Sequence, residues 1–119
     1  MRWEDIVSYG LEKPGVREDY PFGPSPLVLK VGSKMFALVS RDGDGSVSVS
    51  LKCDPDAAVM LRQEFEAVKP GYHLNKTHWN TVVVDGSVPE RDLRWMIDHS
   101  YELVRGKLPK AERESLKRT

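Results

Sequence analysis

The segment from Tyr72 to Asn80 concentrates side chains that can recognise a ligand. Its nine residues include two histidines, two asparagines, a lysine, a threonine, a tyrosine and a tryptophan. Chemistry of this kind in a loop indicates function more strongly than the same residue types in a core. The sequence therefore predicts a binding site, and its candidate residues are Tyr72, His73, Asn75, Lys76, His78, Trp79 and Asn80.

A structural explanation of the same segment stays open. Trp79 would then belong to the core, His73 would be hydrogen bonded locally, and the other polar residues would make a turn. If the segment is a strand hairpin, His78 and Asn80 point to one face and Trp79 points to the other, because side chains alternate along a strand.

Metal binding and catalysis find little support in the residue pattern. A metal site needs three or four converging ligands, and the chain offers only His73, His78, His99 and Cys53, with no pair at the usual zinc spacing. There is no Gly-x-Ser-x-Gly elbow, no phosphate-cradling glycine loop and no dinucleotide fingerprint. We therefore expect no catalytic residues, no cofactor and no metal, and we do not expect an enzyme.

The single cysteine, Cys53, bears on both reactivity and location. It precedes the N-terminus of a predicted helix, where the helix dipole can lower the pKa of a thiol, but a small residue that ends a strand is the favoured explanation. A lone cysteine forms no internal disulfide, and the N-terminus is charged rather than apolar. These features predict a cytoplasmic protein.

Length and composition limit the organisation of the chain. Its 119 residues, 39% of them hydrophobic and 30% charged, suit one globular domain. We expect this domain to cover residues 1–109 and a flexible basic tail to cover 110–119. No apolar run approaches the roughly 18 residues needed to cross a bilayer, so no membrane partner is expected. The 18 basic and 18 acidic side chains cancel.

Hydrophobic periodicity and turn residues predict a two-layer α+β fold, α-β(3)-α-β(2)-α, with the helices on one face of an antiparallel sheet and the other face open. The predicted elements, in chain order, are a helix of about ten residues from Trp3, strands at 27–31, 34–40 and 46–52, a helix that starts at Pro55 and ends before Pro70, a hairpin from Tyr72 to Val84 that turns near Asn75 to Thr77, and a last helix that begins with a capping box at Ser87 and Glu90.

Four segments resemble the MmcQ/YjbR family of small bacterial proteins. They are Lys13-Pro14-Gly15 with Tyr20-Pro21-Phe22-Gly23, then Val31-Gly32-Ser33-Lys34-Met35-Phe36-Ala37, then the stretch from Pro70 to Asn80, and last His99-Ser100-Tyr101-Glu102-Leu103-Val104. The resemblance covers nearly the whole chain, in order. It implies an architecture related to bacterial frataxin and a similarity to double-wing domains, for which DNA binding has been proposed.

Two functions are compatible with these features. In the first, the open sheet and the loop around Lys76 contact DNA, and Lys30, Lys34, Lys52 and the basic tail contact phosphates. Because the net charge is zero, this function requires basic side chains to gather on one face.

In the second, a small molecule or a protein binds a pocket or apolar patch formed by Tyr72, His73, His78, Trp79 and Asn80 beside the last helix. Trp95 and Leu103, with His99 between them, would then contact a partner or a second copy, so the protein is expected to be a monomer or a weak homodimer.

Overall fold

The fold was analysed in a computed structural model that describes residues 1–116. Its elements are α1 (Trp3–Leu11), β1 (Val16–Asp19), β2 (Leu27–Val31), β3 (Lys34–Arg41), β4 (Val47–Lys52), α2 (Pro55–Glu64), β5 (Val68–Pro70), β6 (Trp79–Val83), α3 (Glu90–Gly106) and α4 (Lys110–Leu116).

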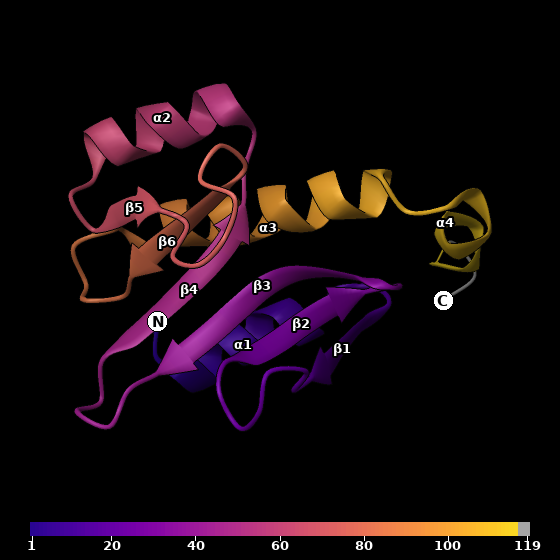
Figure 1. Ribbon diagram of the computed structural model, residues 1–119, viewed down its shortest axis with the longest axis horizontal. Coiled ribbons are helices and arrows are strands. Elements are labelled where there is room, and N and C mark those ends of the chain that lie inside the picture. Colours follow the sequence, from indigo (N-terminus) through magenta and orange to yellow (C-terminus); the bar gives the residue numbers. More distant parts are fainter. Residues whose placement is uncertain (117–119) are drawn as a thin grey trace.

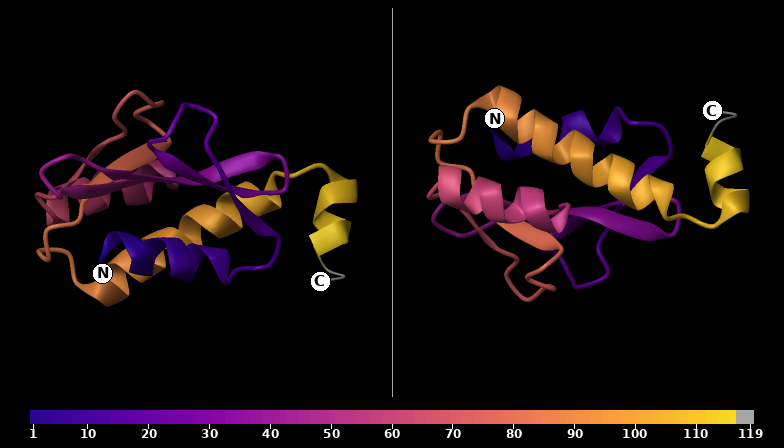
Figure 2. Two further views of the ribbon diagram at one scale, coloured as in Figure 1. Left: turned by 90° about the horizontal axis from the view of Figure 1, so that it is seen from below. Right: turned by 90° about the horizontal axis from the view of Figure 1, so that it is seen from above.

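The six strands form one antiparallel sheet in the order β1-β2-β3-β4-β6-β5. Helices α1 and α3 pack on one face of this sheet, whereas α2 lies beside its β5 edge and α4 lies past the end of α3 (Figures 1 and 2). The opposite face carries no helix, and we call it the open face. The predicted α+β fold with an open sheet is thereby confirmed.

The core lies between the sheet and α3. Strand residues such as Val39, Val49 and Val82 are almost completely buried, and they meet the inner side of α3. That side repeats at helical spacing and comprises Leu93, Met96, Ile97, Ser100, Tyr101 and Val104, all buried. This stripe agrees with the amphipathic pattern of the sequence, because buried positions three and four residues apart share one side of a helix.

Ser100 is the polar member of this stripe, and it joins α3 to two strands. Its hydroxyl donates to the Phe36 carbonyl at 2.6 Å and accepts the Lys52 N–H at 2.9 Å. The pairing of β2 with β3 shifts by one residue next to Phe36, and the pairing of β3 with β4 begins only at Ala37. Ser100 therefore satisfies backbone groups at the point where the ladder between β3 and β4 ends.

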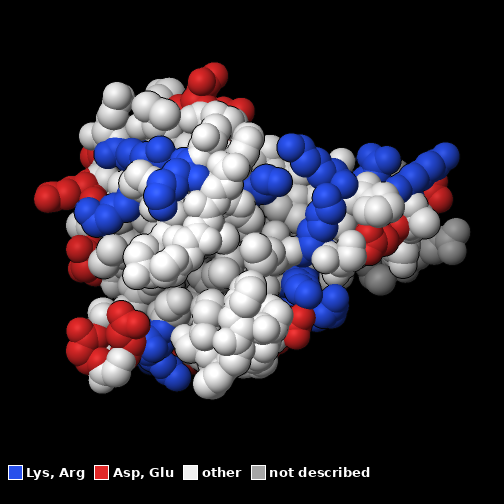
Figure 3. Space-filling model, viewed as in Figure 1, with Lys and Arg blue, Asp and Glu red and all other residues white. Residues whose placement is uncertain are grey.

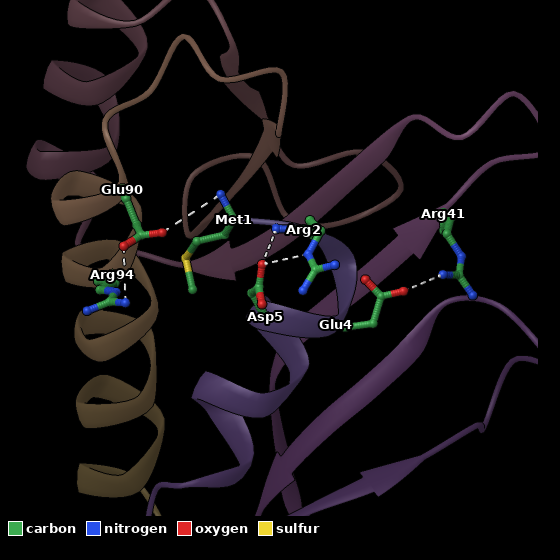
Figure 4. Close-up of polar contacts among 7 residues, drawn as sticks. All are labelled: Met1, Arg2, Glu4, Asp5, Arg41, Glu90 and Arg94. Carbon is green, nitrogen blue, oxygen red and sulfur yellow. Dashed lines mark hydrogen bonds and ion pairs between the residues drawn. The ribbon is translucent and has the colours of Figure 1, made fainter.

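Ion pairs connect elements near the N-terminus (Figure 4). Glu4 of α1 pairs with Arg41 of β3 at 3.1 Å. Glu90, at the start of α3, lies 4.0 Å from the amino group of Met1 and 3.1 Å from Arg94. Exposed pairs such as that of Glu4 with Arg41 each contribute about 0–1 kcal/mol, so they orient these elements more than they stabilise them.

Three elements were not predicted from the sequence: β1, β5 and α4. Strand β1 reads Val-Arg-Glu-Asp and lacks an apolar alternation, because it is an edge strand that pairs only with β2. Helix α4 occupies residues 110–116 of the segment expected to be a flexible tail. It contacts the rest of the molecule through Glu112, which accepts a hydrogen bond from Ser33, and through Leu116, which lies against Gly15. Residues 117–119 of that segment lie outside the described part of the chain.

Two predicted boundaries were wrong, whereas the second helix begins at Pro55 and ends before Pro70 as expected. Helix α2 ends at Glu64, because Phe65 is already extended, and the next residues form β5 before Gly71. The predicted hairpin from Tyr72 to Val84 is therefore an eight-residue connection, 71–78, followed by β6. The predicted capping box at Ser87 is absent: Pro89 is the N-cap residue of α3, and the Ser87 hydroxyl donates to Asp85.

Replacing Ser100 tests its role. We expect Ser100→Ala to lower the free energy of unfolding by about 1–3 kcal/mol, because the buried Phe36 carbonyl and the half-buried Lys52 N–H lose their partner. Urea denaturation measures this change. Ser8→Ala, at an exposed position of α1, is the matched control and should change stability little, since alanine suits a helix. Equal effects of the two substitutions would contradict the proposed role of the hydroxyl.

Candidate functional site

Two loops rise beside the open face of the sheet. Residues 20–26 connect β1 to β2, and residues 71–78 connect β5 to β6; both project away from α1 and α3 (Figure 2). Each loop exposes aromatic rings: Phe22 is 61% exposed and Tyr72 is 71% exposed. The open face is thus a sheet surface with an aromatic loop on either side.

The side chain of Arg62, on α2, holds the 71–78 loop through several hydrogen bonds. Its guanidinium donates to the side-chain oxygen of Asn80 at 2.6 Å, to the carbonyl of Trp79 at 3.2 Å and to the carbonyl of Lys76. The Asn80 amide in turn donates to the Ala58 carbonyl of α2 at 3.4 Å. One charged side chain therefore ties the second half of this loop and the start of β6 to α2.

Hydrogen bonds within the loop fix its shape. The Asn75 side-chain oxygen accepts the N–H groups of Thr77 and His78, at 2.9 and 3.3 Å, and the Lys76 amino group donates to the Gly71 carbonyl at 2.8 Å. A side chain at Gly71 would place its Cβ 2.7 Å from the Cβ of Trp79, so only glycine fits there.

The structure divides the seven predicted site residues into two groups. Trp79 and Asn80 are buried, at 9% and 3% exposure, while Asn75 and Lys76 use their polar atoms to hold the loop. His78 is half-buried and precedes β6, so the predicted alternation of His78, Trp79 and Asn80 along one strand does not apply to it.

Tyr72 and His73 form the exposed group. Their rings are in contact, with centroids 4.1 Å apart, and His73 has a positive φ of 59°, which is uncommon for a residue other than glycine. The seven predicted residues therefore do not gather in one pocket. The void beside Cys53 and Asn80 measures only about 10 Å³, too little for any ligand larger than a water molecule.

Eight basic side chains of the described residues have no carboxylate partner, three of them lie on the open face, and sequence reasoning found only part of this set. Within the described residues, the cations that form no ion pair are Arg17, Lys34, Lys52, Arg62, Lys69, Lys76, Lys107 and Arg113. Strand register places Arg17, Lys52 and Lys69 on the open face itself. Lys30, a predicted phosphate contact, is instead paired with Asp19 at 2.9 Å.

The helical side of the molecule, by contrast, has paired charges. Asp98 of α3 accepts a hydrogen bond from the Tyr9 hydroxyl at 2.7 Å and pairs with Lys13, whose amino group also lies over the rings of Tyr9 and Tyr101. Burial, followed by the bond to Asp98, raises the pKa of Tyr9 to about 12. Asp98, Tyr9 and Lys13 thus form one network on this side, away from the open face of the sheet.

Three lysines cluster where β3, β4 and α3 meet. Burial, then the charges of Lys107 and Lys34, lowers the pKa of Lys52 below its usual value. None of the three forms an ion pair with a described residue. Figure 3 shows the wider setting: lysine and arginine side chains surround an uncharged central area of the open face, and the acidic side chains lie mostly at its margins. This arrangement suits an anionic ligand.

Metal and membrane features were also assessed for residues 1–116. In this range no group of three histidine, cysteine, aspartate or glutamate side chains is placed to hold a metal ion. The helices of the same range are too short or too polar to cross a bilayer.

These features define a class: small α+β domains in which an antiparallel sheet has helices on one face and leaves the other exposed. Residues 11–103 match the YjbR family model, and the chain belongs to this family. The uncharacterized protein YjbR of Escherichia coli K12 is 34% identical over 116 residues, 98% of each chain. The uncharacterized protein YbdF of Escherichia coli O157:H7 is 37% identical over 96% of this chain and 93% of its own length.

Solved structures agree with this membership. The crystal structure of a Deinococcus radiodurans protein superposes with a TM-score of 0.88 and 41% identity, covering 98% of this chain and 88% of the other. The crystal structure of a Pseudomonas syringae protein gives a TM-score of 0.74 with 26% identity, over 87% of this chain and 98% of the other. The resemblance to the MmcQ/YjbR family is thereby confirmed.

The bonds of Arg62 lead to a stability prediction. We expect Arg62→Gln to destabilise the protein by about 2 kcal/mol, because charged hydrogen bonds to Asn80 and to the loop carbonyls are lost. Amide hydrogen exchange should become faster in 71–78. Arg91→Gln, which removes an exposed guanidinium from α3, is the control. Unchanged exchange in the loop would show that Arg62 does not hold it.

The buried position of Cys53 leads to a second prediction. Burial, followed by the charge of Asp54, raises the pKa of the Cys53 thiol to about 11, so it is protonated at neutral pH. We expect a thiol reagent at pH 8 to modify the native protein far more slowly than the urea-unfolded protein, since only about a thousandth of the native thiol is ionised. Comparable rates would support the alternative of a reactive cysteine.

Proposed function

We propose that this protein is a non-catalytic binding module whose open face binds a nucleic acid, with DNA as the leading candidate. The observation that carries the proposal is the set of unpaired cations on and around this face, with the cluster of Lys34, Lys52 and Lys107 where β3, β4 and α3 meet. Phosphate groups are the natural partners of such a surface, because binding them releases condensed counterions and stabilises the complex.

The charge cluster is costly to the fold unless a ligand neutralises it. The pKa of Lys52 is lowered in the folded chain, so the unfolded chain holds this proton more tightly. The stability contributed by Lys52 therefore rises as the pH rises through its lowered pKa, and at neutral pH the charged side chain disfavours folding. Side chains that reduce stability in this way are typical of functional surfaces.

The two aromatic loops support the same proposal. Phe22, Tyr20 and Tyr72 are exposed on either side of the open face, and each ring can stack on a base. A surface that combines unpaired cations with exposed aromatic rings is common to proteins that bind nucleic acids.

A small-molecule or protein partner at the segment from Tyr72 to Asn80 is the second candidate function. It is supported by the exposed pair Tyr72 and His73. For a protein partner, the exposed side chains of Met60 on α2 and of Trp95 on α3, which stacks on His99, add apolar surface. Nucleic-acid binding is preferred because it also accounts for the unpaired lysines.

Binding measurements with charge variants test the proposal. Fluorescence anisotropy of labelled duplex DNA and single-stranded DNA should show saturable binding that weakens steeply with salt. We expect Lys52→Gln and Lys107→Gln each to weaken binding and to reduce the slope of log affinity against log salt by about one. Lys76 is less informative than these two, because its amino group holds the loop.

Two controls accompany this experiment. Arg91→Gln removes the same charge from the opposite end of α3 and should leave the affinity unchanged. The unfolding midpoint of Lys52→Gln should be no lower than that of the parent protein, which separates a lost contact from a lost fold. No saturable binding at low salt, or equal losses for Arg91→Gln and Lys52→Gln, would reject the proposed function.

A further inference from the structure

A groove crosses the open face where β4, β5 and β6 meet the 71–78 loop. It has a volume of about 290 Å³, near the lower end of the range for small-molecule sites. Its lining is largely apolar, and the lining residues include Val47, Pro70, Val83 and Tyr72, whose ring also contacts His73. The position of Tyr72 is fixed, because its backbone N–H donates to the Thr81 hydroxyl at 2.9 Å.

The polar groups of the groove suit a neutral ring rather than a phosphate. Ser48 lines the groove, and its hydroxyl forms no side-chain hydrogen bond with the described residues, so it is free to donate or accept. Asp42 is also a lining residue, and its carboxylate accepts a hydrogen bond from the Ser46 hydroxyl at 3.3 Å. A carboxylate repels a phosphate but accepts hydrogen bonds from the amino group of a base.

Lys69 adds a positive charge to the groove. Lys69 is part of its lining and has no carboxylate partner. A ligand ring stacked on Tyr72 would therefore lie near the amino group of Lys69, which can bind a phosphate. The combination of an aromatic wall, an apolar lining, a free hydroxyl and a neighbouring lysine matches a base together with its backbone phosphate.

We propose that this groove receives one unpaired base of a single-stranded nucleic acid, stacked on Tyr72, with the following phosphates running toward Lys52. The inference rests on the proposed function and narrows it. Ser48 and Lys52 lie four residues apart on β4, which corresponds to about 13 Å along the strand. A chain of several nucleotides contacts both places at once, whereas a free nucleotide reaches only one.

Single strands are favoured because their bases are free to leave the stack. In a duplex the ring faces are covered by neighbouring base pairs, and exposing one costs a few kcal/mol. Base stacking on an aromatic side chain stabilises the complex with a single strand by about 1–3 kcal/mol. The groove therefore predicts tighter binding of a single strand than of a duplex of the same sequence.

The test compares a labelled 12-nucleotide single strand of mixed sequence, its duplex, and a nucleoside monophosphate on the full chain. We expect Tyr72→Ala to weaken single-strand binding about tenfold and duplex binding less than twofold, while Tyr72→Phe retains the parent affinity. Ser48→Leu, which fills the groove without removing the ring, should have the effect of Tyr72→Ala. Trp95→Ala removes an exposed ring from α3 and is the matched control.

The outcomes separate this inference from the proposed function. If neither the single strand nor the duplex binds, both fail. If both bind equally, and Tyr72→Ala and Ser48→Leu leave the affinities unchanged, the proposed function stands and the groove is not a base site. If the monophosphate binds as tightly as the 12-nucleotide strand, the ligand of the groove is a free nucleotide and the single-strand assignment is overturned.

Discussion

The hydroxyl of Ser100 is the constraint on which the arrangement of this molecule depends. A helix that crosses a twisted sheet can slide or rotate unless a directional contact fixes it, and apolar packing supplies none. By bonding to backbone groups of both Phe36 and Lys52, Ser100 fixes α3 at the end of the ladder between β3 and β4. The end of α3, with Lys107, is thereby held next to Lys52 and Lys34, so a structural bond brings the basic cluster together.

The 71–78 loop shows how recognition chemistry and structural chemistry overlap in one segment. Its amide, lysine and backbone groups are largely occupied by one another and by Arg62, and this leaves the rings of Tyr72 and His73, near its start, free to contact a ligand. Most hydrogen-bonding groups of this loop therefore have a structural role, which is to hold the two exposed rings in place. This division explains why the same residues fit both a binding interpretation and a structural one.

The sequence predicted the parts of the fold that have strong periodicity, namely α1, α3 and strands β2 to β4. It did not predict β1, whose charged edge sequence lacks alternation, or β5, which has only Val68 as a buried residue. The site was predicted in part, because Tyr72 and Lys52 stand out by residue type. The roles of Lys76 and Asn80 could not be predicted, since they depend on Gly71 and Arg62, which only the folded chain brings near.

The zero net charge of the chain conceals an uneven distribution: on the open face, basic side chains surround an uncharged area and acidic side chains lie mostly at the margins (Figure 3). A neutral particle with a permanent dipole moment experiences little long-range attraction to a polyanion, but it is turned by the field once it comes within about 10 Å, the screening length at moderate salt. Its encounters with a charged polymer would therefore be slow to begin and selective in orientation. Such a molecule would exchange readily between partners and would not coat every anionic surface that it meets.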